Sequence, residues 1–207
     1  MTLIIANMRS NFVGVSDLMI TSKGGGGAVA NPISGLISPD AGNSSIVFFE
    51  QKSVIIGPSE LIMWAGIEKI AMKIINALHI ERKAGKIIIL NELISDLLEE
   101  SESKKVHLMY LTIDEKDTVL LQHFNIGSTP DNKVWGAGSG FDDFMGNGDT
   151  SIAEAVFPNA FIEYCSKIAI ALARADIDGG PHKEEYGGWF EIILKEKGKF
   201  VKHLICW

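Results

Sequence analysis

The sequence predicts an α+β domain in which two antiparallel β-sheets pack face to face and helices cover both outer faces, a four-layer αββα sandwich. Short β-branched and apolar runs occur in groups, separated by two helical stretches in the middle of the chain and one near its end. This order differs from the regular strand–helix alternation of a doubly wound parallel sheet. The chain has no internal repeat, and its 207 residues suffice for one domain with a substantial core. We therefore expect residues 1–207 to form a single domain.

Strands are expected to open the chain. Residues 2–8, 11–17 and 18–22 are short runs rich in β-branched and apolar side chains, and the polar break between the first two predicts a hairpin. A segment at about residues 23–44 contains four consecutive glycines and two prolines, which predicts a flexible glycine-rich insertion. Three further strands are expected at residues 45–50, 52–56 and 61–65.

The pattern then becomes helical. Apolar residues recur at i, i+3 and i+4 over residues 66–84, and Gly85 is well placed to end this helix. A second helix is expected over residues 91–101, followed by a hairpin whose strands are residues 105–113 and 118–124. The remaining elements are a strand at residues 134–135, a short helix after a glycine-rich turn, a long helix over residues 151–175, and a last hairpin of residues 189–194 and 199–205.

Composition narrows the class of protein. The net charge is −7, and no run of lysine or arginine stands above this acidic background, which argues against nucleic acid as a partner. No apolar run reaches the roughly 18 residues that span a bilayer, so we expect no membrane partner. Cys165 and Cys206 lack metal-type spacing, and the five histidines are scattered. We expect a cytoplasmic protein with no metal and no cofactor.

The first candidate for chemistry is Thr2. An initiator methionine is usually removable when the following residue is small, and its removal would leave a threonine that carries both a hydroxyl and a free α-amine. The hydroxyl is a nucleophile, and the amine, with a pKa of about 8, can accept its proton.

Four other residues lie at or near the ends of expected strands. Asp17 ends the second expected strand, and Thr21 follows it by four residues. Lys52 begins an expected strand, and Gly66 ends the next one 14 positions later.

Together with Thr2, these residues resemble the proteasome β-subunit group of N-terminal-nucleophile hydrolases, and the resemblance extends over nearly the whole order of elements. The glycine-rich turn that contains Ser139 and the helix end at Asp176 are similar to further family motifs. The chain departs from the family where Ala137 and Gly179 replace expected serines. The 34 residues between Asp17 and Lys52 are also about twice the usual interval.

The resemblance implies a threonine-type peptidase or amidase. In that role Thr2 attacks a carbonyl, Lys52 with Asp17 and Asp176 tunes the charge, and the backbone N–H of Gly66 binds the oxyanion. Ser139 would lie near the active threonine, and Thr21 would line the substrate channel. The resemblance also implies a homo-oligomer, such as a ring assembled through helices 66–84 and 151–175.

Three alternatives remain open. Ser45 also begins a plausible strand, and aligning it with the family lysine would imply an inactive site. The second alternative is a catalytically inactive subunit of the same fold that acts as an oligomeric scaffold or interaction protein. The third alternative is a related hydrolase that acts on a small amide as a small oligomer.

Overall fold

The computed structural model describes residues 3–8, 12–23, 44–49, 51–138, 141 and 190–205. These residues form an α+β structure with two larger antiparallel sheets, a two-stranded ribbon and three helices, so the predicted pair of antiparallel sheets is confirmed. The predicted helix at 151–175 and most of the glycine-rich insertion lie outside the described residues.

The larger sheet has six strands. In spatial order they are β12 (Lys199–Ile205), β11 (Phe190–Glu196), β2 (Val13–Asp17), β1 (Ile4–Asn7), β10 (Val134–Ala137) and β9 (Gly127–Ser128). Every neighbouring pair is antiparallel. The predicted hairpins between β1 and β2 and between β11 and β12 are therefore confirmed, whereas β9 was not predicted.

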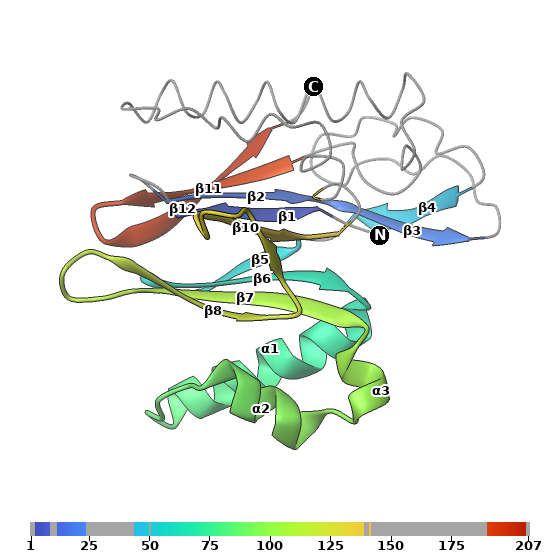
Figure 1. The fold of residues 1–207 in the computed structure, drawn as a ribbon, viewed down its shortest axis with the longest axis horizontal. Helices are drawn as coiled ribbons and strands as arrows, with labels where there is room; N and C mark the ends of the chain where they lie inside the picture. The colour runs from blue at the N-terminus through green and yellow to red at the C-terminus, as the bar shows by residue number, and fades with distance from the viewer. Residues whose placement is uncertain are drawn as a thin grey trace.

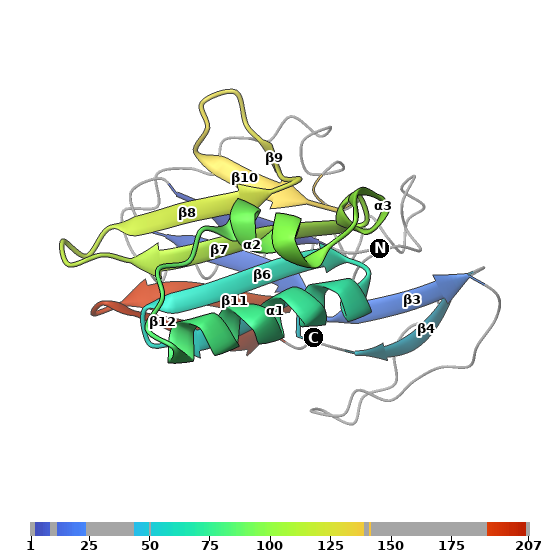
Figure 2. The ribbon, with the colours of Figure 1, turned by 90° about the horizontal axis from the view of Figure 1, so that it is seen from below.

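The second sheet has four antiparallel strands. They are β5 (Ser53–Gly57), β6 (Glu60–Gly66), β7 (Val106–Ile113) and β8 (Val119–Phe124), paired in chain order. Among the described strands, β3 (Met19–Lys23) and β4 (Ser44–Phe49) pair only with each other, and their ribbon extends away from the two sheets in Figure 2.

Three helices cover the outer face of the four-stranded sheet. They are α1 (Glu68–Lys83), α2 (Leu90–Leu97) and α3 (Glu100–Ser103), and Figure 1 shows the helices, the four-stranded sheet and the six-stranded sheet as successive layers. Alternate residues of β6 supply both cores. Leu61 and Met63 face the six-stranded sheet, whereas Ile62 and Trp64 pack against the helices.

The helix boundaries correct two predictions. Gly66 belongs to β6, so α1 begins only at Glu68. The helix predicted over 91–101 is two helices, because Leu98 is extended at φ −119° and ψ 143° and Glu99 then opens α3 with a capping box. Gly85 does end α1: it has φ +74°, and its N–H donates to the Arg82 carbonyl.

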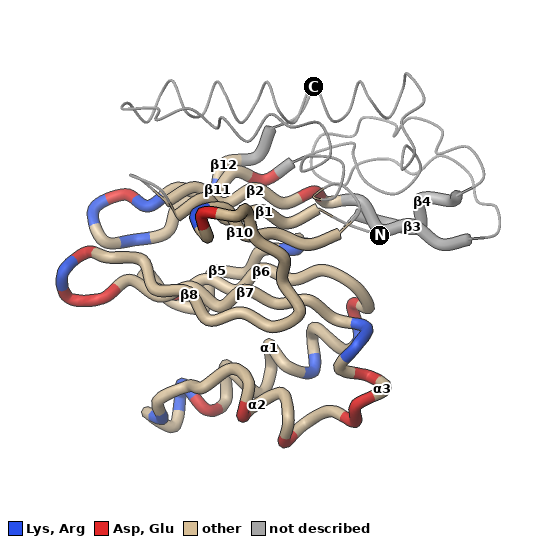
Figure 3. The backbone as a smooth tube through the Cα atoms, viewed as in Figure 1, with Lys and Arg blue, Asp and Glu red and all other residues tan. Residues whose placement is uncertain are grey.

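Most charged residues of the described segments lie outside the strand interiors, although Glu191 and Lys202 lie within β11 and β12. In Figure 3 they gather in the hairpin turns at 114–117 and 195–199 and along the helices. Within the part of the chain that the structure describes, no helix is both long enough and apolar enough to cross a membrane.

Candidate functional site

A buried ion pair joins the two sheets. The ammonium nitrogen of Lys52 lies 2.8 Å from Oδ1 of Asp17, and neither side chain has any solvent exposure. Asp17 is the last residue of β2 in the six-stranded sheet, and Lys52 directly precedes β5 in the four-stranded sheet. Burial of two charges costs several kcal/mol per ion, so each charge depends on its partner and on further hydrogen bonds.

The pair is anchored at the start of β1. The backbone N–H of Leu3 donates to Asp17 Oδ1 at 2.8 Å, and the Asp17 N–H donates to the Leu3 carbonyl at 3.1 Å. Leu3 follows Thr2 directly in the sequence, although Thr2 itself lies outside the described residues. The ion pair is therefore hydrogen-bonded to the residue that directly follows Thr2, the expected nucleophile.

Trp64 holds the backbone around Lys52. Its backbone N–H donates to the Lys52 carbonyl at 2.9 Å, and its indole N–H donates to the Gln51 carbonyl at 3.2 Å. Trp64 is fully buried between the sheet and the helices, so this support is rigid. The ammonium of Lys52 thus extends from a backbone that is fixed by a neighbouring strand.

Gly66 lies two residues beyond Trp64 in β6, roughly 7 Å along the strand. Its φ is +102°, and a Cβ there would stand 2.2 Å from the Lys105 carbonyl oxygen. Glycine is therefore required at this position by the backbone itself, whether or not its N–H takes part in chemistry.

The remaining predicted residues are only partly placed. Thr21 lies in β3 opposite Ile46, and Ser45 lies in β4 opposite Ser22. Thr2, Ser139 and Asp176 fall outside the described residues. The structure therefore brings Asp17 and Lys52 together, and it sets Ser45 in a separate ribbon.

A second buried polar cluster, which the sequence did not predict, lies beside this pair. Glu191 accepts hydrogen bonds from the hydroxyls of Ser16 and Ser53 and forms an ion pair with Lys202 at 2.9 Å. Ser16 directly precedes Asp17, and Ser53 directly follows Lys52. The only signal in the sequence was a glutamate followed by three apolar residues in a strand, and that pattern does not reveal its partners.

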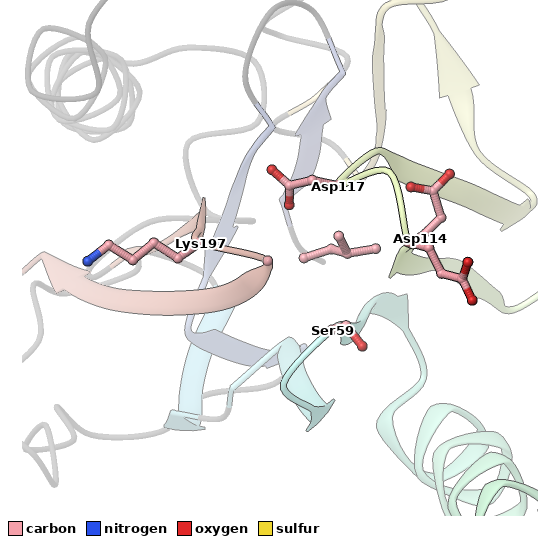
Figure 4. A pocket seen from close by; sticks show the side chains of 7 residues that line it. Ser59, Asp114, Asp117 and Lys197 are labelled. Atoms are coloured by element: carbon pink, nitrogen blue, oxygen red, sulfur yellow. The ribbon is translucent and has the colours of Figure 1, made fainter.

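The structure also has an open hollow of about 490 Å³ where three hairpin turns meet. Figure 4 shows Asp114, Asp117 and Ser59 around it, with the Lys197 side chain extending away from Asp114. Its carboxylates already stabilise the turn: Asp114 Oδ1 accepts from two backbone N–H groups, and Asp117 pairs with Lys195 at 2.8 Å. We therefore assign this hollow a structural origin.

The Lys52–Asp17 pair remains the best-defined candidate site. Over the described ranges, no three His, Cys, Asp or Glu side chains are grouped so that they could hold a metal ion. No protein-family model and no curated protein sequence matches this chain. The function of this site must therefore be inferred from the geometry of the described residues and from the motif spacing.

Proposed function

We propose that this chain is a threonine-type N-terminal-nucleophile hydrolase with a proteasome β-subunit-like αββα fold, acting on a peptide or another amide. One observation carries the proposal: Lys52 and Asp17 form a fully buried ion pair at the amide of Leu3, the residue after Thr2. The same observation favours Lys52 over Ser45 at the family's lysine position. The proposal requires a processed chain in which Thr2 has a free α-amine.

In the proposed reaction the Thr2 hydroxyl oxygen attacks the amide carbonyl carbon, and its proton passes to the Thr2 α-amine, directly or through water. The tetrahedral adduct collapses when the C–N bond breaks, and the leaving amine takes the proton back from the α-ammonium. Water then attacks the resulting ester and gives a proton to the α-amine. The C–O bond to Thr2 then breaks, the acid leaves, and the Thr2 oxygen takes the proton back from the α-ammonium, which restores the hydroxyl and the free amine.

The buried ammonium of Lys52 supplies a fixed positive charge next to the attacking oxygen. Because no water reorganises around it, such a charge stabilises the developing negative charge more than an exposed lysine does. Asp17 keeps the ammonium in position. The Gly66 N–H is the proposed oxyanion donor, and Asp176 contributes to the charge balance. Ser139 supplies a hydroxyl near the active threonine, and Thr21 contacts the substrate.

The test is covalent labelling with a β-lactone, followed by intact and peptide mass spectrometry. We expect one adduct on Thr2 in the processed protein and none in Thr2→Ala. Lys52→Met should label slower by about 100-fold or more, as expected when a preorganised electrostatic group is removed. Thr118→Ala, at an exposed threonine in the β7–β8 turn, is the matched control and should label normally.

Two outcomes would overturn the proposal. The first is equal labelling of Thr2→Ala and the parent protein. The second is a parent protein that begins with Thr2, as shown by its mass, yet takes no label.

One observation favours the second candidate, a non-catalytic assembly subunit. Ile80, Ile87 and Ile89 on the helical layer are 64%, 92% and 50% exposed, and exposed isoleucines are typical of contact surfaces. An unlabelled protein that retains Met1 and sediments as a defined oligomer would support this candidate.

A further inference from the structure

We infer that Glu191 is a positioning residue for the Lys52–Asp17 pair. Its buried carboxylate accepts hydrogen bonds from Ser16 and Ser53, which adjoin Asp17 and Lys52 in the sequence. It thereby sets the separation of the two charged groups. The effect on hydrolysis rests on the proposed function, whereas the effect on the geometry of the pair does not.

One carboxylate oxygen reaches both segments of the site. Glu191 Oε2 accepts from the Ser16 hydroxyl at 3.3 Å and from the Ser53 hydroxyl. Both serines are fully buried, and Glu191 is only 3% exposed. Since Ser16 adjoins Asp17 in β2 and Ser53 adjoins Lys52 at the start of β5, a single atom connects the backbones that carry the ion pair.

The other oxygen ties the same cluster to the last strand. Lys202 lies 2.9 Å from Glu191 Oε1, and its ammonium also donates to the Ser53 carbonyl at 2.6 Å and to the Ser53 hydroxyl at 3.3 Å. Ser53 is thus held through its side chain and its backbone by two strands of the opposite sheet. The bonds to Ser53 run from one sheet to the other. Strands β5 and β2 belong to different sheets and share no backbone hydrogen bonding.

This polar network fixes the relative position of two segments, which apolar packing does not do. The two sheets also meet through apolar side chains such as Ile4, Met63 and Ile193, and such contacts are not directional. Replacing a buried ion network with apolar residues is often neutral for stability, so stability alone does not account for its presence. Directional hydrogen bonds do fix the relative position of Ser16 and Ser53, and the Lys52–Asp17 distance depends on that position.

The test uses amide hydrogen exchange in the full chain, because the Leu3 N–H donates directly to Asp17. In Glu191→Ala we expect Leu3 to exchange faster by about tenfold relative to Leu108, which lies in the interior strand β7 of the four-stranded sheet, since local opening is separable from global unfolding. Glu191→Gln keeps an oxygen acceptor for the serines and should give a smaller change.

Glu60→Gln is the matched control. Glu60 is also a buried carboxylate, at 8% exposure, but it accepts hydrogen bonds from Arg82 and Tyr110 on the helix side of the four-stranded sheet. Loss of its charge should change the exchange of Leu3 and Leu108 in the same proportion. If Glu191→Ala does not fold, Ser53→Ala removes one of the serine hydroxyls and should shift the Leu3 to Leu108 ratio in the same direction.

Activity provides a second measurement. With a chromogenic amide substrate, Glu191→Ala should lower kcat by about 10- to 100-fold while KM stays constant, because a positioning residue acts on the transition state. An unchanged Leu3 to Leu108 ratio in both Glu191→Ala and Ser53→Ala would overturn the inference. Failure of Thr2 to take a β-lactone would contradict only the proposed hydrolysis, since the exchange ratio requires no activity.

Discussion

Lys52 and Asp17 carry opposite charges at a place where neither side chain reaches water. A lone charge there would be strongly destabilising, so the two residues must be considered as a unit. Exposed pairs in the same chain are different: Lys104 and Glu100 lie 2.6 Å apart, but their side chains are 70% and 83% exposed. Solvent screening and the side-chain entropy lost on pairing offset most of the attraction, so such a pair contributes little to the free energy of unfolding.

This contrast gives a stability prediction for single residues. Lys52→Met leaves a buried carboxylate without its ion-pair partner and should lower the free energy of unfolding by about 3–5 kcal/mol. Asp17→Asn combined with Lys52→Met should recover much of that loss, because neither charge of the pair then remains buried. Urea denaturation measures both, with Lys104→Met as the control at less than about 0.5 kcal/mol. Equal losses in Lys52→Met and Lys104→Met would contradict the burial argument.

Residue spacing predicted part of the candidate site and missed the rest. The strand signals around Asp17, Lys52 and Gly66 are local, so their positions at strand ends could be read from the sequence. Glu191 lies in an ordinary strand pattern, and its role depends on which strands become its neighbours. That pairing is set by the tertiary fold, which no local pattern encodes.

At the scale of elements, a polar clamp fastens α1 to the four-stranded sheet. Glu60 at the start of β6 accepts from Arg82 in the last turn of α1 at 2.8 Å and from the Tyr110 hydroxyl of β7 at 3.0 Å. Burial, followed by the negative charge of Glu60, raises the pKa of Tyr110 well above its usual range. The phenol therefore remains protonated in the folded protein at pH values where it ionises in the unfolded chain.

Because of this clamp, the free energy of unfolding should depend on pH in the alkaline range. The unfolded chain loses the phenolic proton near pH 10, whereas the native state keeps it, so the native state binds more protons and stability falls as the pH rises. This group should lower the unfolding free energy by up to about 1.4 kcal/mol per pH unit above pH 10. Tyr110→Phe should show a shallower decline in urea unfolding between about pH 10 and 12. Parallel profiles for the two proteins would count against the clamp.

Helix periodicity predicted α1 and α2 because their apolar stripes are local, but it joined α2 to α3. The break at Leu98 arises because this residue adopts an extended backbone, and Glu99 then caps the next turn. A continuous pattern of good helix formers does not show such a break. Element boundaries were thus less predictable than the elements themselves.

For the whole molecule, the main contact is between the two sheets. Gly14 of β2 lies at this contact, where a Cβ would come within 3.2 Å of the Met63 sulfur and 3.3 Å of Ile193. The absence of a side chain at Gly14 lets Met63 of the opposite sheet approach closely. The order of elements predicted two sheets, but it did not predict that β2 would lie between β1 and β11, because that neighbour comes from the far end of the chain.

Gly14→Val should therefore force the sheets apart. We expect a loss of about 1–3 kcal/mol in the free energy of unfolding, as is typical of overpacked cores. Unfolding should still occur in one step, with far-ultraviolet circular dichroism and tryptophan fluorescence changing together. Gly57→Val is the control, because a Cβ at Gly57 meets only the Glu60 Cβ at 3.9 Å. A larger loss at Gly57 than at Gly14 would show that sheet packing is not tight at this point.

The hydrogen bond between Ser16 and Glu191 links residues 175 positions apart. A nascent polypeptide has therefore made Ser16 and Ser53, and with them Asp17 and Lys52, long before it has made the carboxylate of Glu191 that binds the two serines. Until Glu191 has been made, the ion pair lacks the bonds that set its geometry. The order of synthesis itself thus delays maturation of the site until β11 has been translated.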